Sequence, residues 1–418
     1  MKILWVANVI IPRIERMQGK PSQSVFGGWL SGLSDELLGN DMVELCFCYP
    51  QNESINVIKG KEKNFSYFGF PQRVNNTGDY FVELLNAYNP DIIHFFGTEF
   101  TWSYQFALKC EELGYLNRTV TSIQGMVSVY TEHFFADIPL GWRYTATLSE
   151  ICYKNSMRSM YRSYQKRGYS EIKEVKLIPN IIGRTNWDRG CTKLINPHSE
   201  YYKCNETLRN AFYSGSWSLD NCEKRSIYFS QASKPIKGMH ILLKALEIVL
   251  KHYPDTQVYV AGDNILRGNW IKGSAYGLYL KSVIRKHGLK DHIHFLGKID
   301  AEKVKERLLK THVFVSASSI ENSSNSLGEA MLLGVPCIAS DVGGTSNLIQ
   351  HNKEGYVYPF NEFYMLAFYI MEIFSDSVLS NQFSKNARCR AMITHDPKAN
   401  NDRLMEIYKD IMEKNQDA

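Results

Sequence analysis

The chain has 418 residues, too many for one ordinary domain, and its length predicts two or three. Hydrophobic residues make up 44% and charged residues 22%, a composition that excludes a disordered or fibrous protein. The net charge of +5 is mild and the basic residues are spread along the chain, which argues against a nucleic-acid partner. Such an excess favours an anionic ligand, such as a nucleotide diphosphate, or an anionic membrane surface.

The cysteines and the N-terminal residues indicate the cellular compartment in which the protein is expected. None of the nine cysteines has C-x-x-C spacing, so we expect buried free thiols in a reducing cytosol and no zinc site. The apolar run that begins at Ile3 is too short for a signal-peptide core. No stretch reaches the roughly 18 apolar residues of a membrane span. We therefore expect a cytoplasmic protein.

The first half of the chain alternates short apolar runs with helical patterns. Such alternation predicts a parallel α/β sheet. The expected strands are 3–9, 43–48, 91–96 and 119–123, and the expected helices are 30–38, 80–87 and 104–113.

The second half repeats this alternation. The expected strands are 226–231, 257–261, 292–296, 313–317 and 336–339, with helices at 238–252 and 301–309. Two such sets in series predict two Rossmann-like, doubly wound parallel sheets that face each other across a cleft. We expect an N-terminal domain over 1–212 and a C-terminal domain over 213–399. The pattern is weakest at 205–225, the expected linker, and a final helix within 400–418 is expected to pack back on the first domain.

The segment from Ser318 to Met331 follows an expected strand and opens a helix. In an open parallel sheet, ligands bind beyond the carboxyl ends of the strands, where this segment lies. Seven residues separate Glu321 from Glu329. On local sequence alone, Ser326 and Glu329 also fit a capping box, in which the acid merely satisfies a backbone N–H group.

This segment resembles the E-x7-E region of the retaining glycosyltransferases of family 4, which have the GT-B fold. The resemblance implies that Glu321 lies near the donor sugar and that Glu329 binds the ribose hydroxyls of the nucleotide. It also implies that the backbone N–H groups of Asn325, Ser326 and Leu327 face the diphosphate. A helix N-terminus suits that ligand because it carries partial positive charge and unpaired donors.

Lys237-Gly238 is the second match to this family, in which the lysine contacts the donor diphosphate. The later Gly343-Gly344 and Glu354-Gly355 also fit the family pattern. Many members carry an arginine at the end of the preceding strand, where this chain has Gln231. Gln231 can donate a hydrogen bond but supplies no charge, and Lys234 is a candidate substitute.

The N-terminal half resembles the family more loosely. Gly27 and Gly28 precede a helix and match a glycine pair that lets the backbone approach the donor phosphate or the acceptor; the alternative is a plain turn. Gln124 stands where many relatives have a histidine near the reacting sugar. Glu99 follows a strand and is a candidate acceptor-binding residue, against a cap or salt bridge. Farther along the chain, Arg184 and Asp188 either pair with each other or touch ligand.

The resemblance implies an enzyme that transfers a hexosyl or related sugar, with retention, from a UDP- or GDP-linked donor. The expected acceptor is a hydroxyl of a glycan or lipid-linked glycan, in cell-surface polysaccharide assembly. No Asp-x-Asp pair suggests a metal, so we expect neither metal nor cofactor. The alternative is a catalytically weak GT-B relic that binds or regulates another glycosyltransferase. A glycoside hydrolase needs two carboxylates flanking one bond, and a dehydrogenase needs a Gly-x-Gly-x-x-Gly motif that is missing after the first strand.

The stretch 153–176 is rich in lysine and arginine among tyrosines and methionines. One interpretation is a solvated helix face. The other is peripheral attachment to an anionic membrane on the inner face of the cell.

Overall fold

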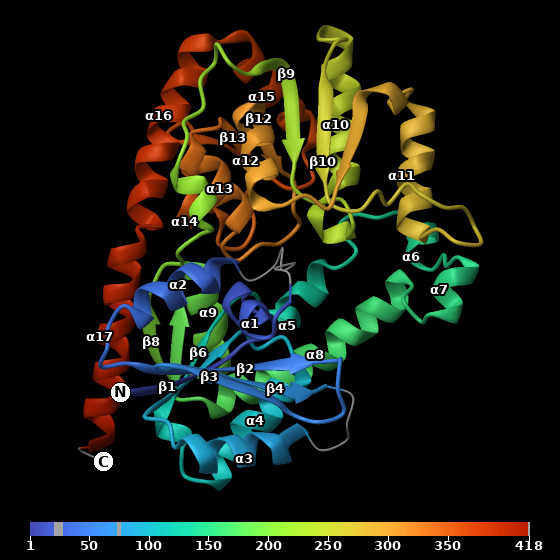
Figure 1. Cartoon of the computed structure of the whole chain (residues 1–418). Coiled ribbons are helices and arrows are strands. Elements are labelled where there is room, and N and C mark those ends of the chain that lie inside the picture. The colour runs from blue at the N-terminus through green and yellow to red at the C-terminus, as the bar shows by residue number, and fades with distance from the viewer. Residues whose placement is uncertain (21–27, 73–76, 417–418) are drawn as a thin grey trace. The chain divides into compact units, whose positions relative to one another are not determined.

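The computed structural model describes residues 1–20, 28–72 and 77–416, and these form two compact units (Figure 1). Unit 1 comprises Met1–Ser128, Lys166–Asn210 and His395–Ala418. Unit 2 comprises Val129–Gln165 and Ala211–Thr394. Each unit is built around one sheet.

The sheet of unit 1 is parallel except for one edge strand. In sheet order its strands are β3 (Ile58–Glu62), β4 (Phe65–Pro71), β2 (Glu44–Gln51), β1 (Lys2–Val6), β5 (Ile92–Phe96), β6 (Thr119–Ser122), β7 (Asn180–Gly183) and β8 (Glu200–Lys203). Only β3 runs antiparallel, against β4. The chain order reverses between β1 and β5, so a topological switch point lies there.

Side chains of the central strand alternate between two buried faces, as the pleat requires. Ile3 and Trp5 belong to one apolar cluster and Leu4 and Val6 to another. The helices of this unit are α1 (Pro12–Met17), α2 (Gly28–Leu38), α3 (Thr77–Tyr88), α4 (Thr101–Glu112), α9 (Asn186–Ile195) and α17 (Pro397–Gln416). Two helices cross the division between the units: α5 (Val127–Tyr130) and α8 (Met157–Leu177).

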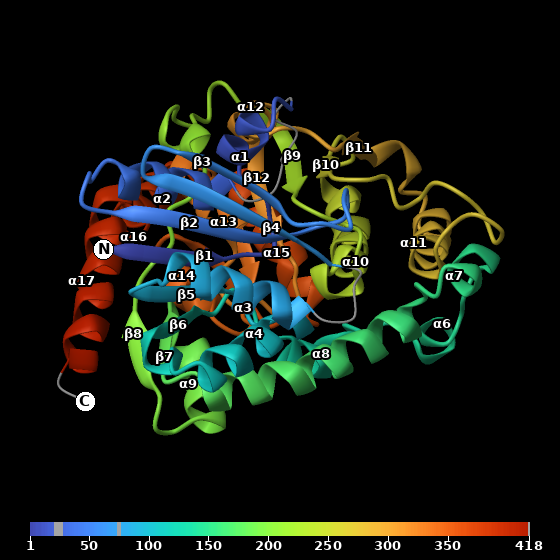
Figure 2. The same ribbon diagram turned by 60° about the horizontal axis from the view of Figure 1, so that its bottom comes forward.

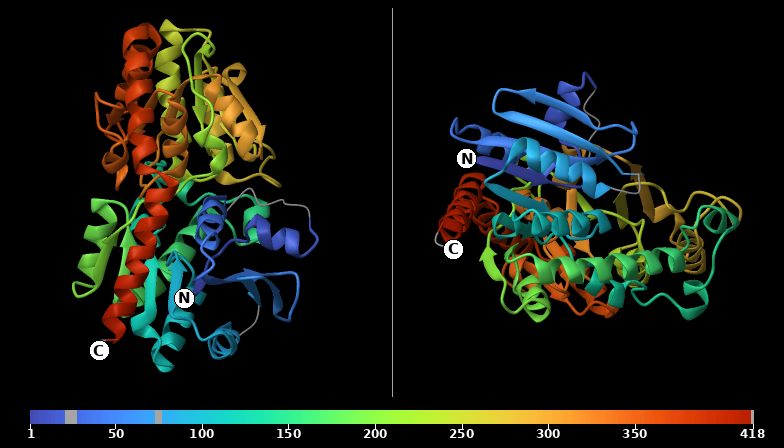
Figure 3. Two further views of the ribbon diagram at one scale, coloured as in Figure 1. Left: turned by 60° about the vertical axis from the view of Figure 1, so that its left-hand side comes forward. Right: turned by 90° about the horizontal axis from the view of Figure 1, so that it is seen from below.

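Helix α17 completes the core of unit 1, where Figure 3 shows it running beside the sheet. The fully buried Tyr408 hydroxyl accepts a hydrogen bond from Trp5 Nε1 at 3.0 Å and lies 2.6 Å from His94 Nδ1. The other ring nitrogen of His94 lies 2.7 Å from Ser122 Oγ. Burial lowers the pKa of His94 to about 3, so the ring is neutral and this polar chain is satisfied without a charge.

The sheet of unit 2 is entirely parallel. In sheet order its strands are β11 (Ile293–Gly297), β10 (Gln257–Ala261), β9 (Glu223–Phe229), β12 (Thr311–Ser316), β13 (Cys337–Ser340) and β14 (Gly355–Tyr358). Taken in chain order, this is the strand order 3-2-1-4-5-6 of a doubly wound sheet. Its switch point lies between β9 and β12.

Helices flank the unit 2 sheet, with α10 packed on α15 and α13 packed on α12 and α16. Their bounds are α6 (Leu140–Arg143), α7 (Leu148–Cys152), α10 (Met239–His252), α11 (Ala275–Lys286), α12 (Ala301–Leu309), α13 (Asn325–Leu333), α14 (Thr345–Leu348), α15 (Phe363–Ser375) and α16 (Ser377–Thr394). No single described helix is long and apolar enough to cross a membrane; only residues 363–375 and 377–416, taken together as a sharply bent pair, meet that measure.

The division into units differs from the predicted boundary, because Val129–Gln165 groups with unit 2 and not with residues 1–212. Hydrogen bonds explain this. Buried His240 of α10 bonds the carbonyl of Ala136, and Thr147 Oγ1 donates to the carbonyl of Gly273 at 2.8 Å. Residues that follow β6 in sequence are therefore tied to α10 and to the loop before α11, both in unit 2.

Candidate functional site

The predicted donor residues gather at the switch point of the unit 2 sheet. Lys237 and Gly238 follow β9, and Glu321 follows β12, the neighbouring strand. The carboxyl ends of parallel neighbours meet at one sheet edge, which is where ligands of open α/β sheets bind.

Lys237 is held in place by a tight turn. It ends the 3-10 turn Pro235–Lys237, and Gly238 then takes a left-handed conformation at φ +73° before α10 begins. A Cβ atom on Gly238 would lie 1.7 Å from the carbonyl oxygen of Ala317, so only glycine fits. Ser319 N–H donates to the Ile236 carbonyl at 2.8 Å and joins the loop after β9 to the loop after β12.

Glu321 is the direct partner of Lys237. Its Oε1 accepts from Lys237 Nζ at 2.5 Å and from Ser318 Oγ at 2.7 Å. Its side chain is 13% exposed and that of Lys237 is 27% exposed, so a ligand can still reach both. The Glu321 carbonyl accepts from Gly344 N–H at 2.9 Å, and a Cβ atom on Gly343 would lie 2.0 Å from the same oxygen. Glycine is therefore needed at Gly343, and the backbone N–H of Gly344 helps to hold the loop that carries the acid.

Helix α13 begins four residues after Glu321 with its first turn uncapped. The N-cap is Ser324, whose side chain makes no capping hydrogen bond. Within the described part of the chain, the structure gives no acceptor to the backbone N–H groups of Asn325, Ser326 and Leu327. Three orphan donors and the positive end of the helix dipole thus lie close in sequence to the Lys237–Glu321 pair, an arrangement suited to an anion.

The capping-box interpretation of Glu329 is wrong. That box requires Ser326 as N-cap, whereas the helix starts at Asn325 and Ser324 is the N-cap. Glu329 therefore falls in the second turn, 4% exposed.

At position 231, where many members of the resembled family carry an arginine, this chain has no cation. Gln231 lies just after β9, is half-buried and makes no hydrogen bond to the described residues. Lys234 is exposed, and its Nζ lies 3.5 Å from the Tyr164 hydroxyl. Lys234 is therefore near this loop but engaged with an aromatic side chain.

One contributor escaped sequence reasoning. The hydroxyl of Tyr130 accepts from Asn322 N–H at 3.2 Å, and Ser319 Oγ donates to the carbonyl of His133 at 3.1 Å. The segment after α5 therefore braces the acid loop. No local motif marks Tyr130, because its partner Asn322 lies 192 residues away in the sequence.

The remaining predicted positions lie in unit 1. Gly27 is outside the described residues, and Gly28 begins α2. Glu99 follows β5 and Gln124 follows β6, and both side chains surround Gly97: a Cβ atom there would lie 2.1 Å from Glu99 Oε2 and 3.5 Å from Gln124 Cγ. The two residues therefore meet at the carboxyl edge of this sheet.

Glu99 has a perturbed carboxyl group. Its pKa is raised from 4.5 to about 7, chiefly by loss of solvation and to a lesser extent by the nearby Glu171 carboxyl, against the opposing effects of a backbone hydrogen bond and of Arg167 and Arg184. A carboxyl group that titrates near neutrality can hold or take up a proton from a hydroxyl ligand.

Glu171 of α8 braces this edge. Its carboxylate accepts from Thr98 Oγ1 at 3.0 Å, Val127 N–H at 3.0 Å and Ser128 N–H at 2.9 Å, so it joins the loops after β5 and β6. Sequence reasoning overlooked Glu171 because it lies inside the basic stretch 153–176. Its complete burial shows that this part of the stretch is not a solvated face.

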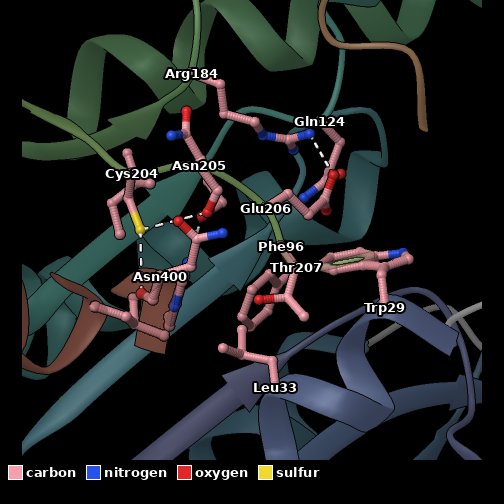
Figure 4. A pocket seen from close by; sticks show the side chains of 14 residues that line it. Trp29, Leu33, Phe96, Gln124, Arg184, Cys204, Asn205, Glu206, Thr207 and Asn400 are labelled. Atoms are coloured by element: carbon pink, nitrogen blue, oxygen red, sulfur yellow. Dashed lines mark hydrogen bonds and ion pairs between the residues drawn. The ribbon is translucent and has the colours of Figure 1, made fainter. Parts of the chain in front are cut away.

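A small cavity of about 30 Å³ opens beside Gln124 (Figure 4). Trp29 forms part of its wall and packs edge-to-face on Phe96, with ring centroids 5.6 Å apart. The Thr207 hydroxyl, also in the wall, is buried and makes no hydrogen bond to the described residues. The volume matches about one water molecule or one small polar group.

Arg184 also lines this cavity, and it pairs with Glu206 in a buried ion pair. Asp188, its predicted alternative partner, instead accepts from the backbone N–H of Arg184 at 2.9 Å. Glu206 and Thr207 were missed because they lie in the predicted linker, where the sequence shows no periodic pattern. Among the described residues, no three His, Cys, Asp or Glu side chains cluster as metal ligands would.

Comparison with known proteins places the site in a family context. Residues 218–390 match the model of "Glycosyl transferases group 1". The chain is 29% identical over 197 residues to the putative glycosyltransferase YtcC of Bacillus subtilis, covering 46% of each chain. It is 26% identical over 190 residues to the phosphatidyl-myo-inositol mannosyltransferase of Mycobacterium leprae, covering 45% of this chain and 47% of the other. The matches thus span about half the length of these curated relatives.

Solved structures match over the whole length. The sucrose-phosphate synthase of Thermosynechococcus elongatus has a TM-score of 0.70 at 14% identity and covers 99% of this chain and 100% of its own. Anabaena HepE, solved in complex with UDP-glucose, has a TM-score of 0.67 at 16% identity and covers 98% and 100%. These likenesses establish the fold. Residues 218–390 therefore resemble the group 1 glycosyl transferases, and the chain as a whole has the GT-B fold.

Proposed function

We propose that the protein transfers a sugar from a UDP- or GDP-linked donor to an acceptor hydroxyl, with retention of configuration. One observation carries this proposal: a cation and an acid, Lys237 and Glu321, are paired at the switch point of the unit 2 sheet, beside the uncapped start of α13. A nucleoside diphosphate needs the cation and the free N–H groups, and its sugar needs a hydrogen-bond acceptor.

In this proposal the diphosphate lies on the N–H groups of Asn325, Ser326 and Leu327 and against Lys237 Nζ. Glu329 accepts from the ribose hydroxyls, and Glu321 accepts from hydroxyls of the donor sugar. The bond between the anomeric carbon and the diphosphate oxygen breaks, and negative charge grows on the leaving group. Lys237 and the helix start stabilise that charge.

The acceptor hydroxyl attacks the anomeric carbon from the face that the diphosphate leaves, and its proton passes to the departing phosphate oxygen. No protein nucleophile takes part. Because the charge is met by Lys237 and the helix donors, the proposal includes no metal ion; unchanged turnover after treatment with a chelator is the corresponding test.

The acceptor is proposed to be a hydroxyl of a glycan or lipid-linked glycan, as in cell-surface polysaccharide assembly. The cavity in unit 1 has room for one hydroxyl group of such an acceptor, since Gln124 and Thr207 offer polar groups without partners among the described residues beside the ring of Trp29. The names of the relatives agree with this class, because one is a mannosyltransferase of a phosphatidyl-inositol.

The deciding experiment measures thermal stabilisation by a panel of sugar nucleotides, followed by donor hydrolysis and transfer with the nucleotide that binds. A donor at 100 times its dissociation constant adds about 2.7 kcal/mol to stability. Binding together with turnover supports the enzyme. Binding without hydrolysis or transfer favours a relic that lost activity, an alternative supported by Gln231 and Gln124 where relatives carry arginine and histidine. No binding to any of the sugar nucleotides refutes the donor site.

A further inference from the structure

Unit 2 exposes a run of large apolar side chains away from the donor residues. Five lie within 140–153, on and around α6 and α7, and two lie in the loop before α11, with exposures from 56% to 77%. We call them the apolar ridge: Leu140, Tyr144, Leu148, Ile151, Tyr153, Trp270 and Ile271. Contiguous exposed apolar surface of this kind marks an interaction site more often than isolated residues do.

Backbone hydrogen bonds make the two segments one surface. Leu148 N–H donates to the Trp270 carbonyl at 3.0 Å, and Ser149 N–H donates to the Ile271 carbonyl at 2.9 Å. The rings of Trp142 and Trp270 stack with centroids 6.1 Å apart. Figure 2 shows α6 and α7 at the end of α8, beside the loop that leads into α11.

Hydrogen bonds within the loop before α11 fix the exposed positions of Trp270 and Ile271. Asn269 Oδ1 accepts from Ile271 N–H at 2.9 Å and Lys272 N–H at 3.2 Å, and Gly273 N–H donates to the Asn269 carbonyl at 2.7 Å. On the other segment, Thr147 and Glu150 form a capping box that fixes α7. Ordered backbone therefore holds Trp270 and Ile271 in water, an unfavourable arrangement that a covering partner would relieve.

The charged side chains within the two ridge segments are mostly basic, and the exposed acids just outside them, Asp137 and Asp263, are paired with Lys244 and Lys298. Residues 140–165 and 264–273 contain one acid, Glu150, which is 4% exposed and accepts from backbone N–H groups. The same two segments contain six basic residues: Arg143, Lys154, Arg158, Arg162, Arg267 and Lys272. All but Arg143 are exposed. The occupant of this surface must be apolar at its centre and anionic around it.

We propose that the apolar ridge docks on the surface of an anionic phospholipid bilayer. Tryptophan and tyrosine rings prefer the headgroup level, and the leucine and isoleucine side chains enter the acyl boundary. The surrounding lysines and arginines meet lipid phosphates. A second copy of the chain is a poorer occupant, because it would bring like-charged segments together.

This site differs from the contact expected from sequence. The basic stretch 153–176 supplies three of its cations, Lys154, Arg158 and Arg162, but the apolar side chains come from 140–153 and from 270–271. The proposal does not depend on the donor site, and its test involves no catalysis.

The test is co-sedimentation of the full chain with vesicles of phosphatidylcholine and phosphatidylglycerol, and with vesicles of phosphatidylcholine alone. We expect binding to the anionic vesicles that weakens as salt rises. Trp270→Ser with Ile271→Ser, and Lys154→Glu with Lys272→Glu, should each weaken it about tenfold or more. Leu140→Ser with Ile151→Ser provides a second apolar variant, because these side chains take no part in the Trp142 stack.

Matched controls carry the same changes elsewhere on unit 2. Ile393→Ser alters an apolar residue that is 79% exposed, more than any residue of the ridge, and Lys286→Glu with Lys290→Glu alters exposed lysines near the other end of α11. Both should bind like the parent, and all variants should keep its melting profile. Three results overturn the proposal: no binding by the parent, equal binding by folded ridge variants, or a ridge-dependent self-association in sedimentation velocity without vesicle binding.

Discussion

Lys237 Nζ donates to Glu321 Oε1 over 2.5 Å, although 84 residues separate the two in sequence. The pair joins the loops after two adjacent strands, β9 and β12. Because Gly238 and Gly343 each press against a backbone carbonyl of the β12 side, neither partner can move far without breaking close packing. The charges are thus set in place before a ligand arrives.

Lys237→Ala should lower the rate of donor hydrolysis or sugar transfer by about 10²–10³-fold, because the leaving diphosphate loses a fixed cation. Steady-state rates at saturating donor measure this. Lys286→Ala, at an exposed lysine of the same unit, should leave the rate unchanged.

Glu329→Ala should lower turnover on a similar scale and weaken nucleoside-diphosphate binding, because the ribose hydroxyls lose a charged acceptor. Titration calorimetry with UDP and GDP, together with rates, measures both effects. Near-normal turnover in this variant and in Lys237→Ala would refute the site assignment, provided that both melt like the parent.

Gly238→Ala should destabilise the protein far more than Gly288→Ala. Both glycines have positive φ, +73° and +66°, so each alanine meets about 1–2 kcal/mol of backbone strain. Only at Gly238 does the new Cβ atom also meet a carbonyl oxygen, at 1.7 Å; at Gly288 nothing lies within 4 Å. Chemical denaturation measures the free energy of unfolding of the two variants. Equal losses of stability would show that the loop at Gly238 can move to accept the new Cβ atom.

Glu99 should give a pH dependence with a defined sign. Its folded pKa of about 7 lies above the ordinary 4.5, so between these values the folded state binds more protons than the unfolded state. This group therefore reduces stability as pH rises from 4.5 to 7. Glu99→Gln removes the effect, so the melting temperature of the variant relative to the parent should increase from pH 5 to pH 8.

The same group should shape catalysis if its ionised form binds the acceptor. The value of kcat/KM for the acceptor should rise with pH toward a plateau above about 7, and Glu99→Gln should flatten this rise. A pH profile unchanged in the variant would remove Glu99 from the acceptor site.

Tyr408→Phe should cost about 1–3 kcal/mol of stability, because the buried Trp5 N–H loses its acceptor and His94 loses a partner. Urea denaturation measures this. Tyr153→Phe removes a hydroxyl from an exposed ring and should cost nothing measurable; a similar loss in both variants would argue against the buried network.

Elements with buried apolar runs or clear helical spacing were predictable from sequence. The strand 257–261 and the helix 301–309 are confirmed to the residue. The hairpin of β3 and β4 was not predicted: β3 is an edge strand with mostly exposed, charged side chains such as Lys59 and Lys61, and the buried aromatic run of β4 was overlooked. Exposed strands leave little hydrophobic pattern in a sequence.

Some residues of the candidate site were also predictable from sequence, and others were not. Lys237 and Glu321 could be found because each lies in a short motif at the end of an apolar strand. Tyr130 and Thr207 could not, because their positions depend on hydrogen bonds and packing between segments far apart in the chain. The grouping of 129–165 with unit 2 has the same origin, since His240 and Ala136 are distant in sequence.

The part played by α17 in unit 1 has a consequence for biosynthesis. Leu404, Ile407, Tyr408 and Ile411 fill the same core as Trp5, near the start of the chain. A ribosome makes them after residues 211–394 of unit 2, so the sheet of unit 1 emerges with one apolar face open and stays so while those residues are translated. The nascent chain must keep that face from aggregating, and premature termination after Thr394 would release a product whose second unit is complete and whose first is not.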